Sequence, residues 1–117
     1  MGNNDCLFCK IVAKEIPAEI VFEDDKVVVI KDKFPQTHVH LLVLPRTHWA
    51  TINGIPEADL GIMAHLYKVA RGLAKKNQIA DSGYRLVFNV NRNGGQTIFH
   101  VHLHILGGAQ LGGSMVG

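Results

Sequence analysis

Three histidines alternate with apolar residues near the end of the chain. His100, His102 and His104 lie in a segment, residues 99–106, whose other members are all hydrophobic. Because successive side chains of a β-strand point to opposite faces, this spacing predicts a strand with three imidazoles on one face and a hydrophobic core on the other. Three neighbouring imidazoles suit metal binding, anion binding or proton transfer.

A polar segment with two glycines lies immediately upstream of the histidines. Gly94, Gly95, Gln96 and Thr97 offer backbone N–H groups and a hydroxyl group to an anion, although a plain hairpin turn is the alternative. Beside three histidines, this segment favours phosphate binding. We expect His102, which has a histidine two residues away on either side, to be the nucleophile, since a neutral imidazole attacks well once a hydrogen bond fixes its tautomer. A metal ion bound by the three histidines is the rival interpretation.

The two cysteines of the chain, Cys6 and Cys9, are separated by two residues. This spacing allows both thiolates to reach one tetrahedral metal ion, and a complete site needs two further ligands. A reduced pair without a metal and a redox-active pair are the alternatives.

The composition indicates one globular domain over residues 1–117. Hydrophobic residues make up 47% of the chain, enough for an ordinary core. The net charge is +2 and no run of Lys and Arg exceeds two residues, so a nucleic-acid polymer is not expected as a partner, whereas a small anion is. We see no secretory signal and no apolar run long enough to cross a membrane, and we therefore expect a cytoplasmic protein without a membrane partner.

The hydrophobic pattern predicts five strands and one long helix. Strands are expected at residues 20–25, 26–31, 39–44, 84–89 and 99–106. Residues 57–78 carry apolar side chains at spacings of three and four, which is typical of an amphipathic helix. Strands on both sides of one helix indicate an α+β fold with an antiparallel five-stranded meander. The tail, residues 109–117, contains three glycines and is expected to be flexible.

These motifs resemble those of a known family. Residues 94–108, Gly-Gly-Gln-Thr-Ile-Phe-His-Val-His-Leu-His-Ile-Leu-Gly-Gly, look like the signature of the histidine triad superfamily and are similar to its Hint branch of nucleotide-binding phosphoramidases. The earlier segments Cys-Leu-Phe-Cys-Lys-Ile-Val, Glu-Ile-Pro-Ala, Phe-Glu-Asp-Asp and His-Leu-Leu-Val-Leu-Pro-Arg also occur in the family's order. The resemblance implies a homodimer whose two sheets join, with a purine nucleoside monophosphate site in each subunit.

The same resemblance implies roles for individual residues. His102 corresponds to the residue that becomes nucleotidylated, and His104, His100 and His40 complete the catalytic histidines. Asp32 corresponds to the carboxylate that binds the ribose hydroxyls. The residues around the phosphate correspond to Asn89, Gly95, Gln96, Thr97, His102 and His104. The apolar walls of the base pocket correspond to Leu7, Phe8, Ile11, Ile16, Ile30 and Leu42.

The activity implied by the resemblance is hydrolysis of purine nucleoside 5′-phosphoramidates through a covalent nucleotidyl-histidine, with AMP-type or GMP-type nucleotides as ligands. A dinucleoside polyphosphate hydrolase of the Fhit type and a nucleotide-binding regulatory protein with incidental hydrolysis are the alternatives. Thr97 stands where the Hint branch usually has serine, and the tail lacks the tryptophan and proline pair of many relatives. These differences leave the preferred leaving group open.

For the cysteines, the resemblance implies a structural zinc ion bound by Cys6, Cys9, His48 and His100. Such an ion would stabilise the fold, and the chemical step would not need it. Among the remaining histidines, we expect His38 to be peripheral and His65 to be structural.

Overall fold

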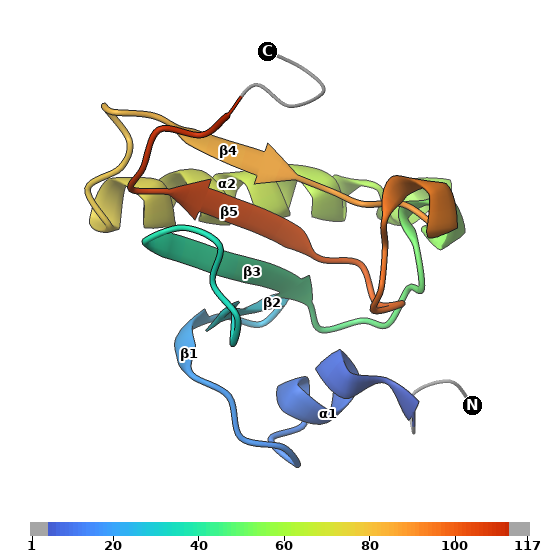
Figure 1. Ribbon diagram of the computed structural model, residues 1–117. Coiled ribbons are helices and arrows are strands. Elements are labelled where there is room, and N and C mark those ends of the chain that lie inside the picture. Colours follow the sequence, from blue (N-terminus) through green and yellow to red (C-terminus); the bar gives the residue numbers. More distant parts are fainter. Residues whose placement is uncertain (1–4, 113–117) are drawn as a thin grey trace.

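The computed structural model describes residues 5–112, which form an antiparallel five-stranded sheet with one long and one short α-helix (Figure 1). The strands are β1 (Ile20–Glu23), β2 (Val27–Lys31), β3 (Val39–Pro45), β4 (Tyr84–Val87) and β5 (Leu103–Gly107). The helices are α1 (Leu7–Val12) and α2 (Gly61–Lys76), and single 3-10 turns occur at Ile52–Gly54, Glu57–Asp59 and Arg92–Gly94. The predicted α+β fold is confirmed. Part of the tail predicted to be flexible, residues 113–117, lies outside the described residues.

The order of strands in the sheet is β1-β2-β3-β5-β4. The sheet therefore departs from a strict meander, because α2 carries the chain across one face to the far edge before β5 returns between β3 and β4 (Figure 1). This crossover places the last strand in the interior of the sheet, between β3 and the edge strand β4.

The two faces of the sheet pack against different helices. In β2, Val27 and Val29 belong to the hydrophobic cluster that includes Leu66 and Leu73 of α2. Val28 and Ile30, on the opposite face of β2, instead pack with Phe8 and Ile11 of α1 in a second cluster. Because neighbouring residues of a strand point to opposite faces, a strand covered on both sides is apolar at nearly every position, as the β-branched run in β2 is. The sequence interpretation of β2 as a buried strand is confirmed.

The long helix is shorter than the predicted 57–78. Residues 57–59 form a 3-10 turn, in which Asp59 donates its N–H to the Pro56 carbonyl at 2.8 Å, and regular α-helix begins at Gly61. At the other end, Gln78 has a left-handed φ of 62°, which stops the helix after Lys76. Within residues 5–112, no helix has both the length and the hydropathy needed to span a membrane.

β5 begins at Leu103, four residues later than the histidine alternation predicts. The residues just before Leu103 are not part of the sheet. Val101 donates its N–H to the Trp49 carbonyl at 2.8 Å, and the His100 imidazole donates to the Pro45 carbonyl. Of the three histidines, only His104 lies in a strand. The prediction of one strand face carrying all three is wrong, because loop and side-chain hydrogen bonds replace the regular pairing there.

Candidate active site and metal centre

The expected nucleophile, His102, is buried, with 8% of its surface exposed. Its Nδ1 lies 2.7 Å from the backbone carbonyl oxygen of His100. Because a carbonyl oxygen only accepts hydrogen bonds, Nδ1 carries the hydrogen and Nε2 keeps its lone pair. Burial lowers the pKa of His102, so the ring is neutral at pH 7. The structure therefore holds this imidazole in the tautomer that a nucleophile requires.

A second chain of contacts orients His104. The Gln36 N–H donates to Nδ1 of His40 at 3.1 Å, so in a neutral His40 the hydrogen is on Nε2. That nitrogen lies 3.0 Å from Nδ1 of His104 and 3.3 Å from Oδ2 of Asp32. When Nδ1 of His104 accepts this hydrogen bond, its own hydrogen is on Nε2. His104 is then a hydrogen-bond donor beside the nucleophile, with the ring centroids of His102 and His104 5.0 Å apart.

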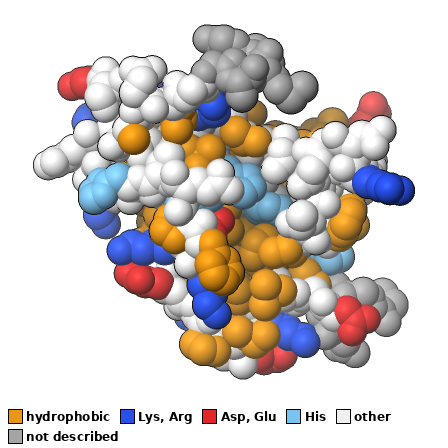
Figure 2. Space-filling view, in the orientation of Figure 1, with side chains coloured by type: hydrophobic (Ala, Val, Ile, Leu, Met, Phe, Trp, Pro, Cys, Tyr) orange, Lys and Arg blue, Asp and Glu red, His pale blue; other side chains and the backbone are white. Residues whose placement is uncertain are grey.

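The protonation of these rings is set mainly by burial. Burial, assisted by the neighbouring His102 and His40, lowers the pKa of His104 to about 4 against the opposing effect of Asp32. Burial also lowers the pKa of His40, against the opposing effect of Asp32. Figure 2 shows histidine side chains near the centre of one face with hydrophobic side chains around them, consistent with this partial removal from water.

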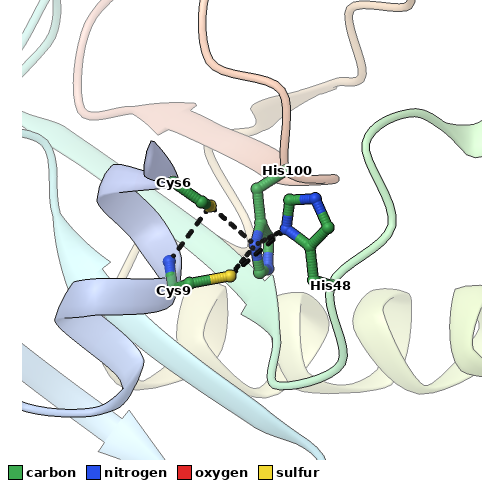
Figure 3. Close-up of side chains that lie close together, drawn as sticks. All are labelled: Cys6, Cys9, His48 and His100. Atoms are coloured by element: carbon green, nitrogen blue, oxygen red, sulfur yellow. Dashed lines mark hydrogen bonds between the residues drawn. The ribbon is translucent and has the colours of Figure 1, made fainter. Parts of the chain in front are cut away.

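The cysteines and two histidines form a separate cluster (Figure 3). Cys6 precedes α1 and Cys9 lies within it, His48 follows β3, and His100 comes from the segment before β5. Nδ1 of His48 lies 3.2 Å from Sγ of Cys9 and 3.2 Å from Nδ1 of His100. Nδ1 of His100 lies 3.3 Å from Sγ of Cys6 and 3.4 Å from Sγ of Cys9. Four ligand atoms from three parts of the chain thus converge on one point.

The hydrogen-bond partners of this cluster fit a metal ion. Nε2 of His100 donates to the Pro45 carbonyl at 2.8 Å, which leaves the lone pair of Nδ1 directed at the cysteines. Two sulfurs and two imidazole nitrogens are the ligand set of structural zinc sites, and a tetrahedral ion with bonds of about 2.0–2.3 Å separates its ligand atoms by about 3.3–3.8 Å. Without a cation, burial and the adjacent Cys6 raise the pKa of Cys9 to about 12. The four residues are therefore positioned to bind a metal.

A second group, Asp32, His40 and His104, has ligand atoms equally close together, but its hydrogen bonds do not suit a metal. Nδ1 of His40 already accepts the Gln36 N–H, so coordination through Nε2 would require the imidazole to lose its last proton. The hydrogen on Nε2 of His40, lying between Nδ1 of His104 and Oδ2 of Asp32, satisfies these atoms without loss of that proton. The rival model in which the triad histidines together bind a metal is not supported either, because the His100 ring faces the cysteines and His104 lies in a different group of possible ligands.

Comparison with known proteins agrees with this geometry. The family model described as scavenger mRNA decapping enzyme C-term binding matches residues 5–115. A purine nucleoside phosphoramidase of Escherichia coli K12 is 39% identical over 108 residues, covering 92% of this chain and 91% of the relative. The crystal structure of a HIT family hydrolase from Legionella pneumophila is 48% identical, with a TM-score of 0.87 over 90% of this chain and 94% of the other. The chain belongs to the histidine triad family.

A further histidine triad structure, a HIT family hydrolase from Clostridium thermocellum, is 40% identical to this protein and covers 96% of this chain and 97% of its own, with a TM-score of 0.91. The superfamily predicted from the motifs is therefore confirmed. The match to the family model extends over both the N-terminal cysteine segment and the triad, because it spans residues 5–115.

In this histidine triad protein, most of the expected base-pocket residues lie together on the α1 side of the sheet. Phe8 is buried and its ring meets that of His102 edge-on, with centroids 5.0 Å apart. The same cluster contains Ile11, Ile16, Ile30 and Leu42. Leu7 is different: it is 41% exposed and lines a separate cavity of about 450 Å³ that also reaches Thr97 and Phe99.

The glycine-containing loop is held by Gln96. Its carboxamide oxygen accepts the Asn91 N–H at 2.8 Å, and its nitrogen donates to the carbonyls of Ala50 and Ile98 at 2.7 and 3.0 Å. Gln96 is buried, and these hydrogen bonds of its side chain fix the shape of the loop. Gly95 has a left-handed φ of 83°, which explains a glycine there. Asn89 is half-buried beyond β4.

Several contacts were not anticipated from the sequence. The Gln36 N–H, the Pro45 carbonyl and the edge contact of Phe8 all orient histidines. His65, expected to be structural, lies on α2 and its Nε2 is 2.8 Å from Oδ2 of Asp24, which follows β1. The contacts of Pro45 and Phe8 depend on folding, because these residues are distant in sequence from the histidines that they orient.

Proposed function

We propose that this protein is a nucleotide-binding hydrolase that cleaves purine nucleoside 5′-phosphoramidates. The tautomer of His102 is the observation that carries the proposal: Nδ1 donates to the His100 carbonyl and Nε2 keeps its lone pair. The activity named for the Escherichia coli relative, purine nucleoside phosphoramidase, supports the same reaction class.

In the proposed reaction, Nε2 of His102 attacks the α-phosphorus of the nucleotide. The phosphorus–nitrogen bond breaks, the amine leaves with the bonding electron pair and takes a proton from solvent, and a nucleotidyl-histidine forms. A water molecule then attacks the phosphorus and gives up one proton to solvent, which releases the nucleoside monophosphate and returns the lone pair to Nε2. Nε2–H of His104 and the hydroxyl and backbone N–H of Thr97 would stabilise charge on the phosphoryl oxygens, which is the main source of catalysis in such transfers. The N–H groups of Gly95 and Gln96 instead donate to the Arg92 and Asn91 carbonyls.

The nucleoside would lie between Asp32 and the α1 side of the sheet. We propose that Asp32 accepts hydrogen bonds from the ribose hydroxyls and that the base packs against Phe8 and its neighbours. In the free protein, Oδ1 of Asp32 accepts the Phe34 N–H at 2.8 Å and Oδ2 faces His40, so the carboxylate is already oriented. Each oxygen retains a second lone pair for a ribose hydroxyl.

We also propose that the metal bound by Cys6, Cys9, His48 and His100 is zinc. A zinc ion would neutralise the thiolates of buried Cys6 and half-buried Cys9 and cross-link α1 to the segments that carry the two histidines. The proposed hydrolysis does not pass through it. Metal analysis of protein purified without chelator should find close to one zinc per chain, and less than about a tenth of an equivalent would contradict the assignment.

We further propose a homodimer formed along β4 and the adjacent part of α2. Among the described strands, β4 is at the edge of the sheet, and its outer side is available for pairing with a second copy. Beside it, Tyr67 is 45% exposed and its ring stacks edge-on against Phe88 at 6.0 Å. Exposed aromatic side chains next to an open strand edge suit a self-complementary interface.

Turnover of an adenosine phosphoramidate tests the assignment of the nucleophile. Replacing His102 by Ala removes the attacking nitrogen, and we expect kcat to fall by about 10³-fold or more. His65→Ala is the control, since His65 bonds to Asp24 outside the triad and should leave turnover unchanged. Full activity in His102→Ala would disprove the mechanism. Faster turnover of a dinucleoside polyphosphate by the wild type would favour a Fhit-type enzyme, and nucleotide binding without turnover would favour a regulatory protein.

A further inference from the structure

His100 belongs to both sites of the molecule, through different parts of the residue. Its ring lies in the cysteine cluster, where Nδ1 faces Cys6, Cys9 and His48. Its backbone carbonyl accepts the hydrogen bond from Nδ1 of His102. The residue is completely buried, so a shift of the ring must be accompanied by a shift of the backbone that orients the nucleophile.

Few hydrogen bonds from other described residues hold the backbone around His100. Residues 98–102 are outside the sheet, and the main-chain hydrogen bond that anchors them is from the Val101 N–H to the Trp49 carbonyl. The side chain of Gln96 adds a bond to the carbonyl of Ala50 and one to that of Ile98. Both Trp49 and Ala50 lie in the loop that carries His48. The loop and the segment before β5 are thus joined by two hydrogen bonds, Val101 to Trp49 and Gln96 to Ala50, and by the cluster itself.

The cluster also positions α1, whose Phe8 side chain contacts the nucleophile. Phe8 lies between the two cysteines in α1, and its ring meets the rings of His100 and His102 edge-on, with centroids 6.1 and 5.0 Å apart. α1 has only six residues, too few for an independently stable helix, so its position depends on the side chains that attach it. The cysteines and the apolar side chains around Phe8 supply that attachment.

We propose that the Cys6–Cys9–His48–His100 cluster positions the nucleophile, with His100 as the positioning residue, so that binding of a metal ion there sets both the orientation of His102 and the affinity for nucleotide. This inference rests on the proposed function for its catalytic consequence. With the four ligand atoms held together, the His100 carbonyl keeps its place and His102 occupies one tautomer. With the four ligands apart, the His100 carbonyl and α1 shift. His102 then populates both tautomers, and Phe8 loses its edge-on contact with the His102 ring.

The test separates the cluster from the nucleophile by replacing a ligand that belongs neither to α1 nor to residues 98–102. His48→Ala removes that ligand, and the comparison of zinc-loaded with zinc-free wild type, in which the loop bond from Val101 to Trp49 has the same residues, distinguishes an effect of the cluster from a shift of the His48 loop. The ¹⁵N chemical shifts of the His102 ring, assigned by their loss in His102→Ala, report its tautomer, and titration with AMP reports affinity. Both are measured for wild type with and without one equivalent of zinc, and for His48→Ala with the same zinc.

For zinc-loaded wild type we expect a single tautomer with the hydrogen on Nδ1. Zinc-free wild type and His48→Ala should show mixed tautomers, AMP binding weaker by about 10-fold, and kcat lower by about 10- to 100-fold, since small misplacements of a reacting group have such effects. His65→Ala, a histidine replaced elsewhere on the molecule, should match wild type in all three measurements.

Two results would overturn the proposal. One is failure of wild type to bind zinc at this site. The other is an unchanged His102 tautomer and unchanged AMP affinity after zinc is removed from a protein whose circular dichroism shows that it remains folded. If His48→Ala does not fold, the comparison of zinc-loaded and zinc-free wild type decides the question. The tautomer and AMP measurements require no turnover, so a failure of the proposed hydrolysis is distinguishable from a failure of this coupling.

Discussion

At the scale of single residues, the three triad histidines differ because their second ring nitrogens meet different partners. His100 donates Nε2–H to the Pro45 carbonyl, which leaves Nδ1 for the cysteines. His102 donates Nδ1–H to a carbonyl, which leaves Nε2 for chemistry. His104 accepts at Nδ1 from His40, which makes Nε2–H a donor. One side-chain type thus supplies a metal ligand, a nucleophile and a hydrogen-bond donor within five residues.

The low pKa of His104 predicts that acid destabilises the fold. Its pKa is about 4 in the folded protein, whereas an exposed histidine of the unfolded chain titrates near 6.5. Between these values the unfolded chain binds more protons, so the stabilising effect of a neutral His104 is complete above about pH 6.5 and is lost as the pH falls towards 4. His104→Gln cannot titrate and should lose less stability over this range.

Urea unfolding of wild type and His104→Gln at about pH 7 and about pH 5 measures this effect. Groups that do not contact His104 titrate equally in both proteins, so the difference between the two pH-dependent losses reports His104 together with the adjoining rings of His40 and His102. Equal losses in the two proteins would show that its pKa is not lowered by folding.

At the scale of elements, glycine has opposite effects on stability in α2 and in the turn after β5. Gly72 is exposed on α2, and a Cβ added there meets no atom within 4 Å. Gly108 follows β5 with a left-handed φ of 85°, and a Cβ added there would lie 2.8 Å from the Cβ of His38. Helix interiors disfavour glycine, whereas left-handed positions require it.

Two glycine substitutions should therefore have opposite signs. Gly72→Ala should raise the free energy of unfolding by about 0.5–1 kcal/mol through better helix propensity. Gly108→Ala should lower it by about 1–2 kcal/mol through the strained φ, with a further loss from the contact with His38. Urea unfolding of the two variants beside wild type checks both values, and a stabilised Gly108→Ala would contradict the geometry of this turn.

At the scale of the whole molecule, the edge strand β4 and the exposed face of α2 predict the state of assembly. Tyr67→Glu places a charge at the centre of the proposed interface and should convert a dimer into a monomer. Phe22→Glu is the matched control, because Phe22 is a half-exposed aromatic on β1 at the opposite edge of the sheet. Sedimentation of the three proteins gives their masses. A monomeric wild type, or dissociation caused equally by both variants, would contradict the proposal.

Much of the architecture follows from local patterns. The β-branched run of β2 and the apolar spacing of α2 predict buried elements because burial requires those side chains. The strand order and the start of β5 do not follow, since they depend on the crossover of α2 and on the carbonyls of Pro45 and Trp49. Periodicity alone extends β5 back to Phe99 because it cannot detect the loop that replaces the partner strand.

The sequence by itself determined the residue types that can do the chemistry: three alternating histidines, a pair of cysteines two residues apart, and the family to which such motifs belong. The tertiary structure decided which histidine does what. A neutral imidazole has one hydrogen to place, and its position is set by the group that meets the opposite nitrogen. For His100 and His40 those groups are the Pro45 carbonyl and the Gln36 N–H, which only the folded backbone brings into contact with these rings.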